Sequence, residues 1–139
     1  MKILVDTSIW SLALRRNKPH HPHAVINELQ ELIREVRVQM IGPVRQELLS
    51  GIKEKTTFLK LKKILAAFPD LPLDSEDFVL AADYFNILRR QGIQGSNTDF
   101  LICAISTRHH LPIFTNDHDF RHYQKHIPII LHKPRTTKE

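Results

Sequence analysis

Four acidic side chains of this 139-residue chain stand where a predicted strand ends or a predicted helix begins. They are Asp6, Glu47, Asp99 and Asp117. Asp6 directly follows residues 2–5 and Asp117 directly follows residues 112–116, and both segments are typical of buried parallel strands. Because ligands of open α/β sheets bind outside the carboxyl ends of the strands, the four acids are candidates for one shared site.

A cluster of carboxylates predicts a bound cation. A single carboxylate at a helix start is usually a cap, so the prediction depends on all four converging. Two like charges about 5 Å apart repel by roughly 3 kcal/mol at an effective dielectric constant near 20. Carboxylate oxygens without His or Cys select hard cations, so Mg²⁺ or Mn²⁺ fits best. Such ions activate a water and stabilise the charge that develops on a phosphodiester during hydrolysis.

The elements that must position these acids alternate between short apolar strands and helices. Strands are expected at 2–5, 38–41, 112–115 and 128–131, and helices at 8–14, 23–37, 55–68, 75–91 and 119–125, with further helices carrying Glu47 and Asp99. This alternation predicts an α/β fold in which helices cover both faces of one parallel sheet. At this length we expect a single domain, residues 1–139.

Local signals place two of the helices more closely. Residues 100–105 are apolar almost all round, so the helix that Asp99 opens should be buried between layers. The positive end of that helix favours the ionised form of Asp99. Ser75, followed by two acidic residues, is expected to cap the helix at 75–91.

The chain is basic overall, with a formal net charge of +5 and a pI near 9.6. Lysine and arginine side chains that neutralise phosphates gain affinity by releasing counterions, so the charge favours a nucleic-acid partner. The basic residues expected near the site are Arg15, Arg16, Lys18, Arg45, Arg108 and Arg121.

Several function classes are disfavoured. The single cysteine, Cys103, excludes an intrachain disulfide and a Cys-rich zinc knuckle. The apolar runs are shorter than the ~20 residues of a membrane span, and residues 1–6 carry no signal-peptide features, so we expect a cytoplasmic protein without membrane contact. His118, His122 and His126 recur every four residues, but a solvated helix face is favoured over a zinc site. Trp10 is favoured as a core or dimer-interface residue over a base-stacking one.

Taken in order, these motifs resemble a PIN domain of the VapC toxin type. The resemblance rests on Asp6-Thr7-Ser8 after the first strand, on Glu47, on Asp99 followed by residues 100–104, and on residues 115–120, and it spans essentially the whole chain. It implies a three-layer α/β/α sandwich with a central, mainly parallel sheet. It also implies a Mg²⁺- or Mn²⁺-dependent endoribonuclease that acts as a toxin, homodimerises and is inhibited by a small cognate antitoxin whose tail covers the active site.

The resemblance also implies roles for individual residues. Asp6, Glu47, Asp99 and Asp117 match the metal-coordinating and catalytic acids of the family. Asp119 matches a further, auxiliary acidic position, and Thr115 matches a hydroxyl residue that supports the site. The loop at 92–97 brings no extra acid, so one metal ion and two both stay open. The alternative function is a catalytically silent RNA- or partner-binding domain of the same fold, and the intact acid set favours the enzyme.

Overall fold

The structure is a computed structural model that describes residues 1–14 and 23–135 of the chain. The predicted loop at 15–22, with Arg15, Arg16 and Lys18, lies outside the described residues, as do residues 136–139. None of the helices in the described part combines the length and the apolar character that a membrane crossing requires.

A parallel sheet forms the centre of the fold. Its strands are β1 (Ile3–Val5), β2 (Val38–Gln39) and β3 (Ile113–Phe114), in the order β2-β1-β3. Ile3 pairs with Val38, and Leu4 pairs with Ile113. Single parallel bridges, Met40 to Asp70 and Ile113 to Leu131, widen the sheet at its two edges. Strand β1 therefore lies in the middle of the sheet, where both of its neighbours shield it from water.

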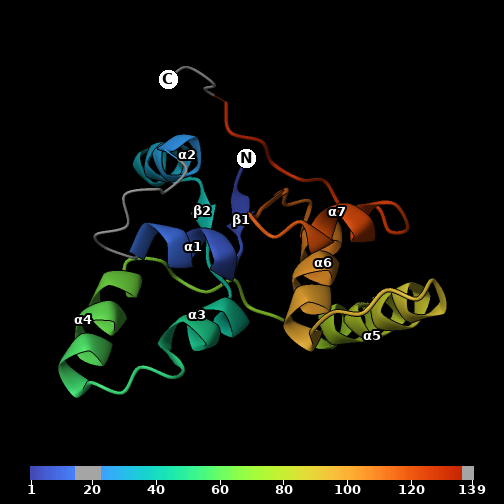
Figure 1. Cartoon of the computed structure of the whole chain (residues 1–139), viewed down its shortest axis with the longest axis horizontal. Helices are drawn as coiled ribbons and strands as arrows, with labels where there is room; N and C mark the ends of the chain where they lie inside the picture. Colours follow the sequence, from blue (N-terminus) through green and yellow to red (C-terminus); the bar gives the residue numbers. More distant parts are fainter. Residues whose placement is uncertain (15–22, 136–139) are drawn as a thin grey trace.

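Helices cover both faces of the sheet. They are α1 (Thr7–Leu14), α2 (His23–Arg34), α3 (Gly42–Leu49), α4 (Lys55–Leu65), α5 (Ser75–Arg90), α6 (Asn97–His109) and α7 (Asp119–Gln124). Figure 1 shows α2 and α4 on one side of the strands and α5 and α6 on the other. The predicted α/β/α sandwich with a central parallel sheet is thereby confirmed.

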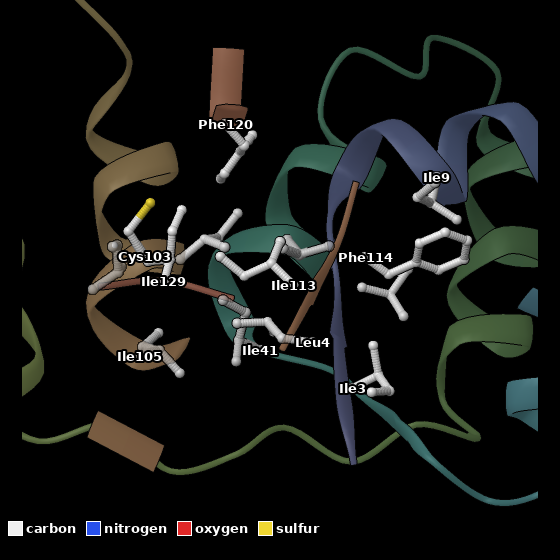
Figure 2. Packing of buried hydrophobic residues seen from close by; sticks show 14 of the residues in the cluster. Ile3, Leu4, Ile9, Ile41, Cys103, Ile105, Ile113, Phe114, Phe120 and Ile129 are labelled. Atoms are coloured by element: carbon white, nitrogen blue, oxygen red, sulfur yellow. The ribbon is translucent and has the colours of Figure 1, made fainter. Parts of the chain in front are cut away.

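The core lies between the sheet and these helices. The three residues of β1 are at most 1% exposed, and residues 100–106 of α6 are all buried, as their apolar pattern predicts. Figure 2 shows Cys103 and Ile105 on the α6 side of this core and Ile3 and Ile9 on the opposite side. Burial of both sheet faces explains why the strands are continuously apolar instead of alternating.

The last predicted strand, 128–131, is reduced to the single bridge at Leu131. Pro128 has no N–H to donate, and the N–H of Ile129 donates to the carbonyl of Ile127 at 2.9 Å. The backbone is therefore turned just before it reaches the sheet edge.

Two helices end three residues earlier than the sequence predicts. Helix α2 stops at Arg34, because Val36 adopts a left-handed conformation with φ of 56°. Helix α4 stops at Leu65 instead of continuing to Phe68. There the carbonyls of Leu65 and Phe68 accept hydrogen bonds from the Arg45 guanidinium, which replaces the helical partners they lack.

The cap of α5 is Asp74 and not Ser75. The Asp74 carboxylate accepts from the N–H groups of Glu76 and Asp77 at 3.0 and 3.3 Å. In return, the Asp77 carboxylate accepts from the Asp74 N–H at 2.9 Å. This reciprocal pair is a capping box, and it satisfies more of the unpaired N–H groups at the helix start than Ser75 alone would.

Arg45 joins α3 to the end of α4, and its contribution to the stability of the fold can be measured. Its guanidinium bonds Asp70 at 2.9 Å and the two carbonyls at the end of α4. We expect Arg45→Met to lower the free energy of unfolding by about 2 to 3 kcal/mol, because those acceptors lose a charged donor. Urea denaturation followed by circular dichroism measures the change. Arg34→Met, which removes an exposed i,i+3 ion pair, should stay within about 0.5 kcal/mol of the parent, and equal losses would contradict the assignment.

Candidate active site

The carboxyl ends of the parallel strands bring the predicted acids to one edge. Asp6 directly follows β1, and Asp117 comes three residues after β3. Glu47 lies on α3, which begins after β2, and Asp99 is the third residue of α6. The negative charges of Asp6 and Asp117 both act on Asp99, so these three carboxyls share one electrostatic environment.

Asp6 is the most deeply buried of the acids, with 4% of its surface exposed. Its Oδ2 accepts hydrogen bonds from the Thr115 hydroxyl at 2.7 Å and from the Ser8 hydroxyl at 2.8 Å. Burial raises the pKa of Asp6 above its ordinary value, and the two hydroxyl donors act in the opposite direction. Neutral donors thus hold the carboxylate in place without cancelling its charge.

Thr115 links Asp6 to the loop after β3. Its Oγ1 donates to Asp6 and accepts from the Asp117 N–H at 3.0 Å. The N–H of Asn116 donates to the Ser8 hydroxyl at 2.9 Å, which closes the loop onto the start of α1. Asp119 donates its backbone N–H to Asp117 Oδ1 at 2.9 Å, while its own side chain is exposed. Thr115 therefore lies where a supporting hydroxyl would act.

Asp99 is held from two sides at the start of α6. The Ser96 hydroxyl caps the helix by accepting from the Asp99 N–H at 3.0 Å. The Tyr123 hydroxyl donates to Asp99 Oδ2 at 3.2 Å. Burial first, and then the charge of Asp6, raise the pKa of Asp99 to about 6. A carboxyl with such a pKa in this position is a candidate functional group.

Glu47 is linked to this group through Thr7, the residue that follows Asp6. Its side chain is exposed, and its Oε1 accepts from the Thr7 hydroxyl at 2.6 Å. Thr7 and Ser8 thus connect Glu47 and Asp6, respectively, to the first turn of α1. The two hydroxyls that follow Asp6 in the sequence thus have different acceptors, since Thr7 binds Glu47 and Ser8 binds Asp6.

The donor set fits a hard cation. Within residues 1–14 and 23–135, no three His, Cys, Asp or Glu side chains are already arranged as a metal-binding group. The ion pairs recorded for these residues nevertheless give no Lys or Arg partner to Asp6, Glu47, Asp99 or Asp117. Burial and then the charges of Asp6 and Asp117 raise the pKa of Asp99, and an oxygen-binding cation would relieve the part that comes from repulsion.

Two of the basic residues expected near the acids have other partners. Arg45 is bonded to the end of α4, as described above. Arg108 lies at the opposite end of α6 from Asp99 and bonds Asp74 and Asp77, each at 2.8 Å. Its placement near the site was therefore wrong, because nine helical residues separate the two ends by roughly 14 Å. Arg121 is exposed on α7, the helix that follows Asp117.

The histidines at 118, 122 and 126, the cysteine and the tryptophan considered in the sequence have structural positions and not catalytic ones. Helix α7 ends at Gln124, so His126 is not on a common helix face with His118 and His122. Cys103 is buried, and burial together with the neighbouring acids raises the pKa of its thiol. Trp10 is 2% exposed and packs edge-on against Phe68, with ring centroids 5.1 Å apart, so it belongs to the core.

Sequence reasoning missed Tyr123 as part of the site. The pattern of α7 marks it only as a buried position, and it is fully buried. The available signal was its residue type, since a buried tyrosine hydroxyl usually has a hydrogen-bond partner. Which partner that is depends on the packing of α7 against the start of α6.

Comparisons with known proteins show what this chain is similar to in sequence and in fold. The sequence model of the PIN domain matches residues 3–126. Ribonuclease VapC11 of Mycobacterium tuberculosis is 33% identical over 122 residues, which are 85% of this chain and 88% of that protein. Among solved structures, FitAcB from Neisseria gonorrhoeae gives a TM-score of 0.74 at 24% identity and covers 95% of this chain and 97% of its own. VapBC2 from Rickettsia felis, bound to a DNA fragment from its promoter, gives 0.74 at 20% identity and covers 95% and 98%.

The raised pKa of Asp99 predicts how the stability of the metal-free protein depends on pH. The folded state holds the proton more tightly than the unfolded state, so stability should fall as the pH rises from about 4 to about 6. Asp99→Asn should remove this loss and stabilise the protein at pH 7.5 by about 1 to 2 kcal/mol, allowing for solvent screening of a half-buried carboxyl.

Thermal unfolding in EDTA at pH 4 and pH 7.5 measures this effect. At pH 4 the parent and Asp99→Asn should unfold at similar temperatures, because the carboxyl of the parent is already protonated. Asp83→Asn, which changes an exposed carboxylate on α5, should leave the pH dependence as it is. A destabilised Asp99→Asn at pH 7.5 would contradict the charge repulsion.

Proposed function

This chain belongs to the PIN domain family, and from that membership we propose that it is an endoribonuclease that acts as the toxin of a toxin–antitoxin pair. The main support for the proposal is the group of Asp6, Asp99 and Asp117 at the carboxyl edge of the sheet. There the charges of Asp6 and Asp117 both act on Asp99. Its relative of 33% identity is named a ribonuclease, which supports RNA as the substrate. Among the described residues no ion pair joins a Lys or Arg to these acids, and a silent binding domain would have no need for such a charge arrangement. We expect the protein to meet its RNA in the cytoplasm.

We propose that Asp6, Glu47, Asp99 and Asp117 hold Mg²⁺ or Mn²⁺, with Asp119 as an auxiliary acid. When bound, such an ion activates a water and stabilises the charge that develops on the phosphodiester. The chain supplies the positioning, because Thr115 and Ser8 hold the Asp6 carboxylate and Thr7 holds Glu47. The net charge of +5 would attract the RNA backbone, and Arg121 is exposed on the helix next to Asp117.

We propose that the cognate antitoxin binds the groove between α1, α3 and α4. This groove has a volume of about 620 Å³ and is lined by Leu14, Leu48, Leu61 and Ile64, among others. Ile64 is 48% exposed, which leaves apolar surface in this groove for a partner to cover. The groove is lined by the last residues of α1 and by Leu48, which directly follows Glu47 on α3, so a segment bound there would lie close to that acid.

We propose that the protein forms a homodimer through one face of α5. The stripe Asp74, Phe78, Ala81, Ala82, Phe85 and Arg89 follows the helical period along this face. An antiparallel second copy would place Arg89 opposite Asp74 and Phe85 opposite Phe78, with the two alanines allowing close approach. Phe78 is 53% exposed at the rim of a groove of about 480 Å³ between α5 and α6, which such a partner would fill. Self-complementarity of this kind suits a two-fold interface.

The acids can be tested by RNA cleavage. We expect the purified protein to cleave RNA with Mn²⁺ or Mg²⁺ and to stop when EDTA is added. Asp6→Asn and Asp117→Asn should each reduce the cleavage rate by at least about 100-fold, more than the loss of an outer hydrogen-bond partner does. Asp83→Asn should cleave at the parent rate. Full activity in EDTA, or in both site variants with their circular dichroism spectra unchanged, would refute the proposed mechanism.

The dimer face can be tested by size-exclusion chromatography with light scattering. We expect Phe78→Glu to convert a dimer into a monomer, because it places a charge in an apolar, self-paired contact. Val79→Glu is the matched control: Val79 is 60% exposed but lies on the adjacent side of α5, outside the stripe. A dimeric Phe78→Glu, or equal dissociation of the two variants, would exclude this face as the interface.

A further inference from the structure

The second oxygen of Asp99 has a donor that the family motifs do not include. The hydroxyl of Tyr123, on α7, donates to Asp99 Oδ2 at 3.2 Å. The ring of Tyr123 is fully buried and packs against Phe100 and Phe120, with centroids 5.4 and 5.1 Å away. Because the ring is enclosed on both sides, its hydroxyl has a fixed place relative to α6.

A glycine makes room for this hydroxyl. A Cβ added at Gly95 would clash with the Tyr123 hydroxyl and would lie 2.8 Å from Phe100 Cζ. Gly95 comes directly before Ser96, the cap of the helix that carries Asp99. The loop, the tyrosine and the carboxylate are therefore packed so closely that no larger residue fits at position 95 without moving the hydroxyl.

Asp99 needs such a donor because nothing in its own geometry fixes the carboxylate plane. The terminal torsion of an aspartate side chain is broad, so rotation is restricted only by neighbours. The neighbouring charges are those of Asp6 and Asp117, and they repel the carboxylate. Without a donor behind it, the side chain would turn away from them and toward solvent.

We propose that Tyr123 is a positioning residue of the candidate active site, whose hydroxyl holds Asp99 Oδ2 and directs Oδ1 toward the ligand shared with Asp6 and Asp117. Gly95 provides the space that this contact requires. The inference rests on the proposed metal site for its functional consequence, but the orientation of Asp99 can be measured without metal.

The chain contains a matched control. Tyr84 is its only other tyrosine, it is 5% exposed, and its hydroxyl also bonds a side chain of α6, Thr107, at 2.9 Å. Thr107 lies eight residues after Asp99, toward the other end of the helix. Tyr84→Phe therefore removes a buried hydroxyl of the same kind at a distance from the acids.

Mn²⁺ binding by calorimetry and electron paramagnetic resonance, in the absence of RNA, tests the proposal. We expect Tyr123→Phe to weaken Mn²⁺ binding by about 10- to 100-fold, as the loss of an outer partner of a metal ligand does, and Tyr84→Phe to leave it unchanged. The metal-free crystal structure of Tyr123→Phe should show the Asp99 carboxylate rotated away from its parent orientation. Unchanged Mn²⁺ affinity together with an unchanged Asp99 would overturn the proposal.

Two further outcomes distinguish the proposed metal site from the roles of Tyr123 and Gly95. If the parent binds no Mn²⁺, the proposed metal site fails, while the orientation of Asp99 in the two crystal structures still decides the role of Tyr123. Gly95→Ala should weaken Mn²⁺ binding in the parent but much less in Tyr123→Phe, where the displaced hydroxyl is absent. Equal effects in both backgrounds would show that Gly95 acts through Phe100 and not through Tyr123.

Discussion

Repulsion among carboxylates at the carboxyl edge of the parallel sheet is the constraint on which the rest of this structure depends. Asp6 is almost completely buried, and burial of Asp99 itself, followed by the charges of Asp6 and Asp117, raises the pKa of Asp99 to about 6. The strands cannot avoid this arrangement, because β1 and β3 are neighbours and their ends meet at the same edge. We therefore expect the cluster to cost stability in the metal-free protein, as functional sites often do.

Hydroxyl groups hold these carboxylates by hydrogen bonds without neutralising their charge. Ser8, Thr115, Thr7 and Tyr123 each donate to one of the acids, so within residues 1–14 and 23–135 the side-chain contacts that anchor these acids are neutral. Cations are used elsewhere: Arg45 closes the end of α4, Arg108 bonds the cap of α5, and Arg135 pairs with the buried Glu28 of α2 at 2.9 Å. This separation leaves the negative potential at the acids, where the proposed metal ion would bind, while these ion pairs join elements of the scaffold.

The surfaces proposed for protein partners lie on different sides of the same site. The groove between α1, α3 and α4 and the apolar face of α5 are on opposite flanks of the sheet (Figure 1). The first reaches the helices that hold Thr7 and Glu47, and the second reaches the first turn of α6, which holds Asp99. Partners bound at either surface would therefore contact elements that carry the acids.

The sequence by itself determined the elements and where the acids stand on them. Apolar strands, helix periods and the acids at their ends depend on neighbours within a few residues, and those predictions agree with the structure apart from helix ends and the last strand. Only the tertiary structure decided which distant side chains meet. Tyr123 with Asp99, Thr7 with Glu47, Arg45 with the end of α4 and Arg108 with the cap of α5 all join residues from different elements. Such pairs follow from how helices pack on the sheet, and a local pattern indicates which face is buried but not which residue of another element it meets.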